Sequence, residues 1–212
     1  MIHLGRRDEV QAILSQRHPA MTAFLVRPSA AFRDSYIEAL REGFTGSGTR
    51  PSLPAEEIDA IAADFETHLG FLDRDGRAVH GDRGRVLPGV PSNMFWLVDN
   101  GVFIGSISIR ARIDTHVLAC YGGHIGYGIR PSKRRLGYGN RQLALGLRIC
   151  RGMGIGVVRI SCGDGNVGSR RIIEANGGLF LRRSEHPWFP GEPVLLFDIP
   201  LLEAEMLVGG TL

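Results

Sequence analysis

The chain has 212 residues, a formal net charge of +3, 43% hydrophobic residues and 22% charged residues. These values are typical of a folded globular domain, and they exclude a disordered or collagen-like chain and an overall nucleic-acid-binding charge field. Apolar runs such as Val194–Phe197 are far shorter than the roughly 20 residues of a membrane span. We therefore expect no membrane partner and one α/β domain over residues 21–212.

Residues 1–20 differ from the rest of the chain and are expected to form an N-terminal extension. Acidic residues lie among the basic ones, and the apolar stretch of a secretory signal is missing. We interpret the extension either as a start codon assigned upstream of Met21 or as a short helix at an oligomer interface, which leaves a homodimer open. The three cysteines show no pairing pattern, so the sequence favours reduced thiols and a cytoplasmic location.

The first half of the sequence predicts a strand, two helices and a long loop. Thr22–Arg27 is strand-like, and Ser29 is a helix cap before the apolar spacing of Phe32, Tyr36, Ile37 and Leu40. A glycine-rich loop over Gly43–Gly48 and a helix from Pro54 to Leu72 follow. Asp73–Asn93 has no period and is expected to be a long loop.

The second half predicts mostly strands. Asn100-Gly101 between two strand-like runs indicates a hairpin. The further expected elements are strands at 122–129, 157–162, 179–183 and 194–199 and helices at 137–151 and 166–175. The resulting order, βααβββαβαββ, predicts an α/β fold with a mixed sheet.

The segment from Ile129 to Gly139 is typical of an anion site. A strand ends near Ile129, and Gly137 and Gly139 remove side chains at the start of a helix, where N–H groups lack internal partners. These N–H groups and the helix dipole favour a bound anion. No acidic residue lies between Arg130 and Arg151, although such basic runs are more often solvated helix faces.

These residues resemble the GNAT superfamily of N-acetyltransferases, whose pyrophosphate loop reads Arg/Gln-x-x-Gly-x-Gly/Ala after an apolar-x-Pro step. Arg134, Gly137 and Gly139 fill the loop pattern, and Ile129 and Pro131 fill the step. The resemblance covers nearly all of residues 22–199. Within the superfamily, 122–127 and 173–178 are similar to a group of bacterial predicted acetyltransferases.

The resemblance implies the GNAT fold: a mostly antiparallel mixed sheet of about six or seven strands flanked by helices, with a V-shaped splay between its two central strands. It implies acetyl-CoA as cosubstrate, no metal, and transfer of acetyl to a primary amine by direct attack in a ternary complex. The implied cofactor-binding residues are Ile129, Arg130, Arg134, Arg135, Leu136, Gly137, Tyr138, Gly139, Asn140, Asn166 and Ser169.

The residues for proton transfer depart from the family pattern. Ile173 occupies the position where many family members carry a tyrosine acid. Tyr127 or Tyr138 could replace that acid, or the thiolate leaves unassisted. His124 is a candidate base, although its odd spacing from Ile129 puts it on the opposite strand face unless a bulge intervenes. Glu66 is a second candidate, for which a solvated carboxylate is the simpler interpretation.

Three other interpretations compete with the enzyme. Gly163–Gly168 reads GxGxxG after a strand, but too few residues follow for a dinucleotide-binding sheet. The basic run lacks interleaved aromatic residues, so we expect no nucleic-acid partner. A CoA-binding sensor that transfers no acetyl group is the main alternative.

The acceptor is expected to be a small-molecule or peptide amine. Its site is expected near the loops Gly43–Gly48, Asp73–Asn93 and His186–Phe189. Asp82 and Glu185 are acids that could attract the amine.

Overall fold

The structure of the protein is a computed structural model that describes residues 22–46, 51–72, 79–80, 86–87, 90–186 and 189–201. The chain divides into two compact units. The first unit comprises Met1–Asp73, Met94–Ile107 and Tyr127–Leu145, and the second comprises Arg74–Asn93, Ser108–Gly126 and Gly146–Leu212. The expected extension at residues 1–20 lies outside the described residues.

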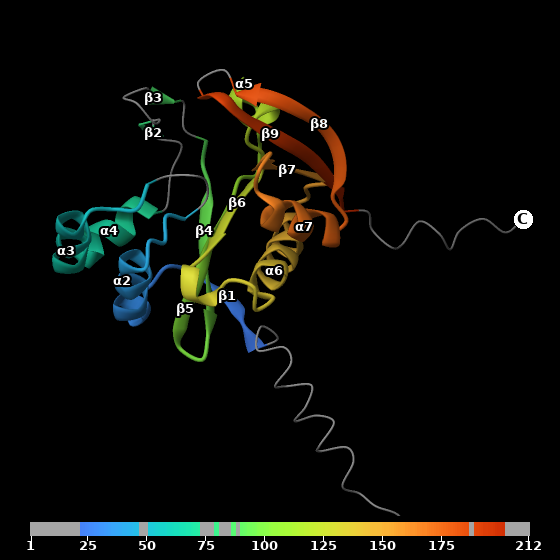
Figure 1. The fold of residues 1–212 in the computed structure, drawn as a ribbon. Helices are drawn as coiled ribbons and strands as arrows, with labels where there is room; N and C mark the ends of the chain where they lie inside the picture. The colour runs from blue at the N-terminus through green and yellow to red at the C-terminus, as the bar shows by residue number, and fades with distance from the viewer. Residues whose placement is uncertain are drawn as a thin grey trace, which may run out of the picture. The chain divides into compact units, whose positions relative to one another are not determined.

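The described elements are those of a mixed α/β fold with a seven-stranded sheet of order β1-β4-β5-β6-β7-β9-β8 (Figure 1). The strands are β1 (Phe24–Val26), β2 (Val79–His80), β3 (Val86–Leu87), β4 (Asn93–Asp99), β5 (Val102–Ile109), β6 (Ile125–Ile129), β7 (Val157–Gly163), β8 (Leu179–His186) and β9 (Phe189–Pro200). The helices are the 3₁₀ turns η2 (Ala30–Phe32) and η4 (Pro131–Lys133) and the α-helices α2 (Arg33–Arg41), α3 (Ala55–Ala63), α4 (Phe65–Leu72), α5 (His116–Cys120), α6 (Tyr138–Gly152) and α7 (Val167–Ala175).

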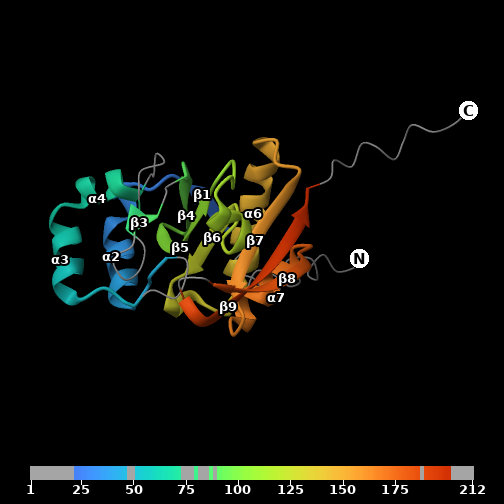
Figure 2. The same cartoon turned by 90° about the horizontal axis from the view of Figure 1, so that it is seen from above.

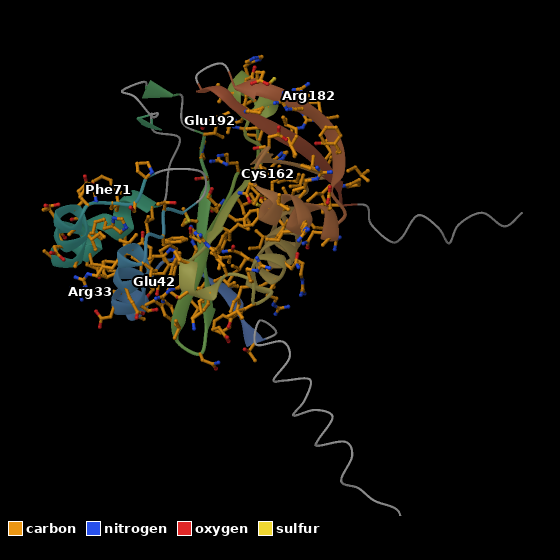
Figure 3. All side chains as sticks on the ribbon, in the orientation of Figure 1. Arg33, Glu42, Phe71, Cys162, Arg182 and Glu192 are labelled. Atoms are coloured by element: carbon orange, nitrogen blue, oxygen red, sulfur yellow. The ribbon has the colours of Figure 1, made fainter. Side chains whose placement is uncertain are left out.

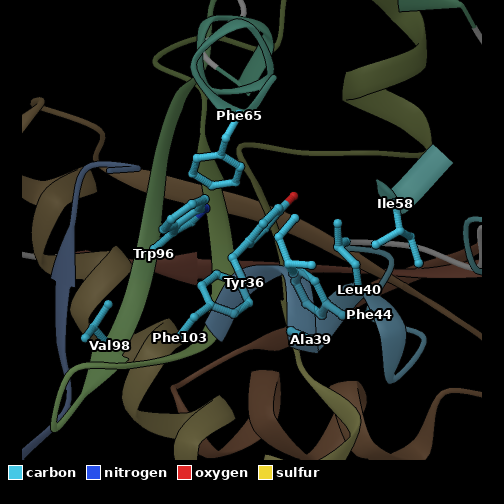
Figure 4. Close-up of a cluster of buried hydrophobic side chains, with 10 residues drawn as sticks. Tyr36, Ala39, Leu40, Phe44, Ile58, Phe65, Trp96, Val98 and Phe103 are labelled. Atoms are coloured by element: carbon cyan, nitrogen blue, oxygen red, sulfur yellow. The ribbon is translucent and has the colours of Figure 1, made fainter. Parts of the chain in front are cut away.

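In the first unit, an aromatic cluster fixes α2, α3 and α4 to one face of β4 and β5 (Figures 2 and 4). Tyr36 of α2 stacks on Trp96 of β4 with ring centroids 4.7 Å apart and meets Phe103 of β5 edge-on at 5.0 Å. Phe65 of α4 and Phe44 pack around these rings. Rings of this size bury much apolar area each, so the cluster is the main stabilising contact of this face.

The opposite face of these strands packs against the first half of α6. Ala23, Leu97, Ile104 and Tyr138 form a second buried cluster. Arg141 on α6 donates from Nε to the carbonyl of Ala23, at 3.0 Å. Strands β4 and β5 are therefore buried on both faces, and in β4 this agrees with the continuous apolar run from Met94 to Val98.

The second unit is organised by β7, β9 and β8. Strand β9 pairs antiparallel with β7 from Val157↔Pro200 to Gly163↔Val194, and β8 pairs antiparallel with the other side of β9. Strand β6 runs parallel to β7, with the register pair Ile125↔Ile160. The V-shaped splay that the sequence predicts between the two central strands involves residues of both units. It therefore stays a prediction.

Several local expectations differ from the structure. The predicted helix 54–72 is broken at Asp64, whose φ of −127° and ψ of 68° are not helical, so α3 and α4 are separate. The expected loop 73–93 contains the short antiparallel pair β2–β3. Its remaining residues, Asp82 included, lie outside the described part except for 90–93. Strand β6 begins at Ile125 rather than Gly122, because residues 116–120 form α5 just before it.

Candidate functional site

The turn between β6 and α6 has an unusual backbone conformation. After η4, Arg135 has a φ of 63° and Gly137 a φ of 84°. The left-handed region suits glycine but costs a residue with a Cβ roughly 1–2 kcal/mol. A strained arginine next to a helix start is an arrangement that clusters at ligand sites.

Backbone N–H groups of this turn have no acceptor. Within the described part of the chain, the N–H groups of Arg135, Leu136, Gly137, Tyr138 and Gly139 donate no hydrogen bond. The first bond back to the turn is donated by Arg141 to the carbonyl of Gly137, at 3.2 Å. Unpaired N–H groups at the positive end of the 15-residue helix α6 make this turn suited to an anion.

The side chain of Arg130, a predicted cofactor-binding residue, is bound by other parts of the protein. Its side chain is only 2% exposed, and its guanidinium donates to Glu38, Glu42, Ser35 and the carbonyl of Phe103. Its N–H donates to the carbonyl of Ile104. The donors of Arg130 are thus already bound to protein acceptors. These acceptors raise the pKa of Arg130 above its ordinary value, and the bond to Glu42 has the largest effect.

Five other predicted residues of this segment lie on its surface. Arg134, Arg135, Leu136, Gly137 and Asn140 are exposed. Arg134 folds back and donates from Nε to the carbonyl of Ile129, at 3.0 Å. The structure therefore brings together the predicted residues from Ile129 to Asn140, apart from the side chain of Arg130.

Tyr138, a candidate acid, has a buried hydroxyl with a defined partner. The hydroxyl donates to Oδ2 of Asp99 at 2.6 Å, and Oδ1 of Asp99 accepts from the hydroxyl of Thr22. Burial, with the Asp99 carboxylate beside it, raises the pKa of the Tyr138 hydroxyl to about 12. Its side chain therefore anchors the start of α6 to the end of β4.

Glycines bring backbone segments of the first unit into direct contact on β6. A Cβ built on Gly128 would lie 2.0 Å from the carbonyl oxygen of Gly46, and one on Gly105 would lie 2.2 Å from that of Gly128. Real Cβ atoms never approach backbone this closely, so both positions need glycine. The segment that follows α2 thus rests directly on β6, one residue before Ile129.

In the second unit, Asn166 is the N-cap of α7. Its side-chain oxygen accepts from the N–H of Ser169 at 3.0 Å, and both residues begin the helix that follows β7. Ile173 of the same helix is fully buried. The capping bond gives Asn166 a structural role, and binding of CoA by Asn166 and Ser169 stays a prediction.

His124, the candidate base, is held by the second unit. It is 8% exposed, and its Nδ1 accepts the N–H of Arg159 at 2.9 Å. In the neutral ring the proton is therefore on Nε2, which leaves that atom no lone pair for a substrate proton. Burial lowers the pKa of His124, with a partly opposing effect of the bond from Arg159.

The remaining candidates differ in position. Tyr127 is half-buried on β6, two residues before Ile129, and alternation along a regular strand puts both side chains on one face. Glu66 is exposed on α4. Trp188 lies outside the described residues.

The described residues contain no group of three or more His, Cys, Asp or Glu side chains that could hold a metal ion. No helix among them is long and apolar enough to cross a bilayer.

A mixed sheet with a glycine-rich turn between a strand and a long helix defines an α/β class of protein whose helix start is suited to an anion. The family model of the acetyltransferase (GNAT) domain matches residues 83–178, which include the turn and the helix after it. This part of the chain is thus similar to GNAT acetyltransferase domains, and the described elements have the GNAT fold.

Solved structures share this fold at low identity. RimJ of Mycobacterium smegmatis, in complex with CoA-disulfide, is 18% identical with a TM-score of 0.59 over 92% of this chain and 88% of that one. A Salmonella typhimurium acetyltransferase that modifies the N-terminal serine of ribosomal protein L7/L12 is 11% identical, with a TM-score of 0.55 over 87% and 98%. YncA of Salmonella typhimurium, with its cofactor acetyl-CoA, is 15% identical, with a TM-score of 0.51 over 87% and 96%. Among curated protein sequences, none matches this chain.

Two residues of the site region were missed by the sequence analysis. Glu42 binds Arg130 and Ser132, and Asp99 binds Tyr138. Both partners lie far away in the sequence, and single acids carry no local pattern. The run of basic residues that lacks any acid from 130 to 151 was the one available signal that acids must come from elsewhere.

Proposed function

We propose that the protein is an acetyl-CoA-dependent N-acetyltransferase that moves the acetyl group to a primary amine by direct attack in a ternary complex. The observation that carries this proposal is the row of unpaired N–H groups from Arg135 to Gly139 inside a GNAT acetyltransferase domain. These groups suit the pyrophosphate of CoA, and Lys133, Arg134 and Arg135 add positive charge around it.

The chemistry requires the amine nitrogen to form a bond to the thioester carbonyl carbon, while the C–S bond breaks and the thiolate leaves. Backbone groups near Ile129 are suited to pair with the pantetheine amides as an added strand does. Tyr127 is the proposed acid for the thiolate, because it lies half-buried on β6 two residues before Ile129. Tyr127→Phe is then expected to lower kcat with little change in the KM for acetyl-CoA.

The acceptor is proposed to be a peptide or small-molecule amine. One solved neighbour modifies the N-terminal serine of a ribosomal protein, which supports including peptides with free N-termini. The decisive experiment measures thiol release from acetyl-CoA with peptides, amino acids, polyamines and aminoglycosides, together with the mass of the product. Acetylation of one amine class supports the proposal.

The alternative is a CoA-binding sensor without transfer, which the buried Ile173 at the usual acid position favours. Such a protein would bind acetyl-CoA in calorimetry but release no thiol with any amine of the panel.

A further inference from the structure

One carboxylate, that of Glu42, holds the segment just before the anion turn. Glu42 follows the last residue of α2 and lies beside η4 (Figure 3). Its Oε2 accepts from the N–H of Ser132 at 3.2 Å, from the Ser132 hydroxyl at 2.8 Å and from Nε of Arg130 at 3.1 Å. Its Oε1 accepts from Nη2 of the same arginine. Both the backbone and the side chain of Ser132 are thereby fixed to α2.

The turn needs such support because its conformation is strained. Arg135 and Gly137 both have positive φ values, and a left-handed arginine persists only where its surroundings hold it. On the far side the turn continues into α6, which Tyr138 anchors through Asp99. On the near side the fixed point is Ser132, three residues before Arg135. Glu42 and Asp99 thus clamp the two ends of the turn.

Glu42 also begins the segment that rests on β6. The next residue, Gly43, has a φ of 87°, and Phe44 donates its N–H to the carbonyl of Ala39 at 2.9 Å. Gly46 then contacts Gly128 through its carbonyl. One residue therefore sets the position of the anion turn and of the backbone laid over β6 beside Ile129.

We propose that Glu42, together with Arg130, is a positioning pair for acetyl-CoA: it aims the unpaired N–H groups of residues 135–139 at the anion and makes no contact with the ligand itself. The choice of acetyl-CoA as the ligand rests on the proposed function, whereas the positioning of the turn by Glu42 does not. The pKa of Glu42 is lowered to about 2, chiefly by its bond to Arg130, so the carboxylate stays ionised across the neutral range.

The test compares two carboxylates that both bind Arg130. Glu38 contacts Nη2 of Arg130 at 2.9 Å but is 68% exposed and does not reach Ser132. In calorimetry we expect Glu42→Gln to raise the Kd for acetyl-CoA about tenfold, because strained donors lose their alignment. Glu38→Gln, the matched control, should stay within about twofold, as exposed ion pairs contribute little.

Two further measurements separate positioning from plain destabilisation. Ser132→Ala keeps the ion pair, removes one hydroxyl bond, and should raise the Kd about threefold, as expected for a lost hydrogen bond. It also carries the test if Glu42→Gln does not fold. The amide resonances of Gly137 and Gly139 should shift in the Glu42 and Ser132 variants and not in Glu38→Gln.

Equal effects of the two glutamine variants on the Kd, or unmoved Gly137 and Gly139 amides in Ser132→Ala, would overturn the inference. If the wild-type chain itself does not bind acetyl-CoA, the proposed function fails. The amide resonances then decide the positioning role alone.

Discussion

Two regions of the molecule are rich in polar groups: the turn at residues 134–139 and the strand region around His124 and Arg159. They differ in whether these groups have hydrogen-bond partners. In the turn, the N–H groups from Arg135 to Gly139 have no acceptor among the described residues, and two φ angles are positive. Around His124, the groups satisfy one another: Nδ1 accepts from Arg159, whose guanidinium binds both oxygens of Asp198 at 2.9 Å. The contrast indicates a binding role for the first region and a structural role for the second.

The strongest way to break this comparison is a charge placed in the turn. Gly137→Glu should weaken acetyl-CoA binding by at least about 100-fold, because a like charge meets the anion and the backbone conformation is lost. Gly154→Glu is a matched control, since Gly154 has a φ of 76° in the exposed turn just after α6. Calorimetry with both variants measures the difference. If Gly137→Glu still binds acetyl-CoA tightly, the anion of the ligand does not bind at this turn.

The second prediction concerns the satisfied region. His124→Ala leaves the partly buried N–H of Arg159 without its acceptor and should lower the free energy of unfolding by about 1–3 kcal/mol. The Kd for acetyl-CoA should not change. His116→Ala, at the exposed first residue of α5, should cost less than about 0.5 kcal/mol. Urea unfolding checks the stabilities. A large loss of turnover without loss of stability would instead make His124 a catalytic residue.

The third prediction is a pH dependence of stability with a defined sign. Burial lowers the pKa values of His124 and His68 in the folded protein, so protons bind the unfolded chain more readily. Both contributions are fully present above the ordinary histidine pKa of about 6.5 and are lost as the pH falls below it. Thermal unfolding from pH 8 to 5 should show this decline, and His124→Ala should make it shallower. An unchanged slope would contradict the assignment of His124.

The smallest expected effect concerns Gln142, whose side-chain amide is the one buried amide without a partner in the described part of the chain. Gln142 on α6 is fully buried, and neither amide atom has a partner among the described residues. Gln142→Leu should raise the free energy of unfolding by about 1 kcal/mol, because no desolvated amide remains. Gln142→Asn keeps the amide and should show no gain. Urea unfolding distinguishes them, and a destabilised leucine variant would reveal a polar partner for Gln142.

The sequence predicts the order of the sheet elements well where local signals are strong. Asn100 and Gly101 have φ values of 48° and 77°, as the hairpin pattern requires, and Asn166 caps α7. The predicted helix 137–151 agrees with α6 to within one residue at each end. Local chemistry decides these features, so a single sequence contains them.

Features that depend on distant partners were not predictable. Arg130 lies in a basic run beside an anion turn, and nothing near it in the sequence reveals that Glu42 and Glu38 bind it in the folded chain. The break at Asp64 has a similar cause. Phe65 packs in the aromatic cluster with Tyr36 and Trp96, and this packing outweighs the continuous helical spacing of the segment.

The bonds of Arg130 also have an evolutionary consequence. Arg130 occupies a variable position of the loop pattern, between Ile129 and Pro131, and its side chain contacts Glu38 and Glu42. Across related sequences, position 130 should therefore change together with position 42, while position 137 remains glycine and position 139 glycine or alanine, independently of both. Two constraints therefore overlap in one short stretch of sequence: the pairing of residue 130 with residue 42, and the backbone conformation of the turn. A relative that has lost the arginine can still keep the turn, provided that its residue 42 has changed as well.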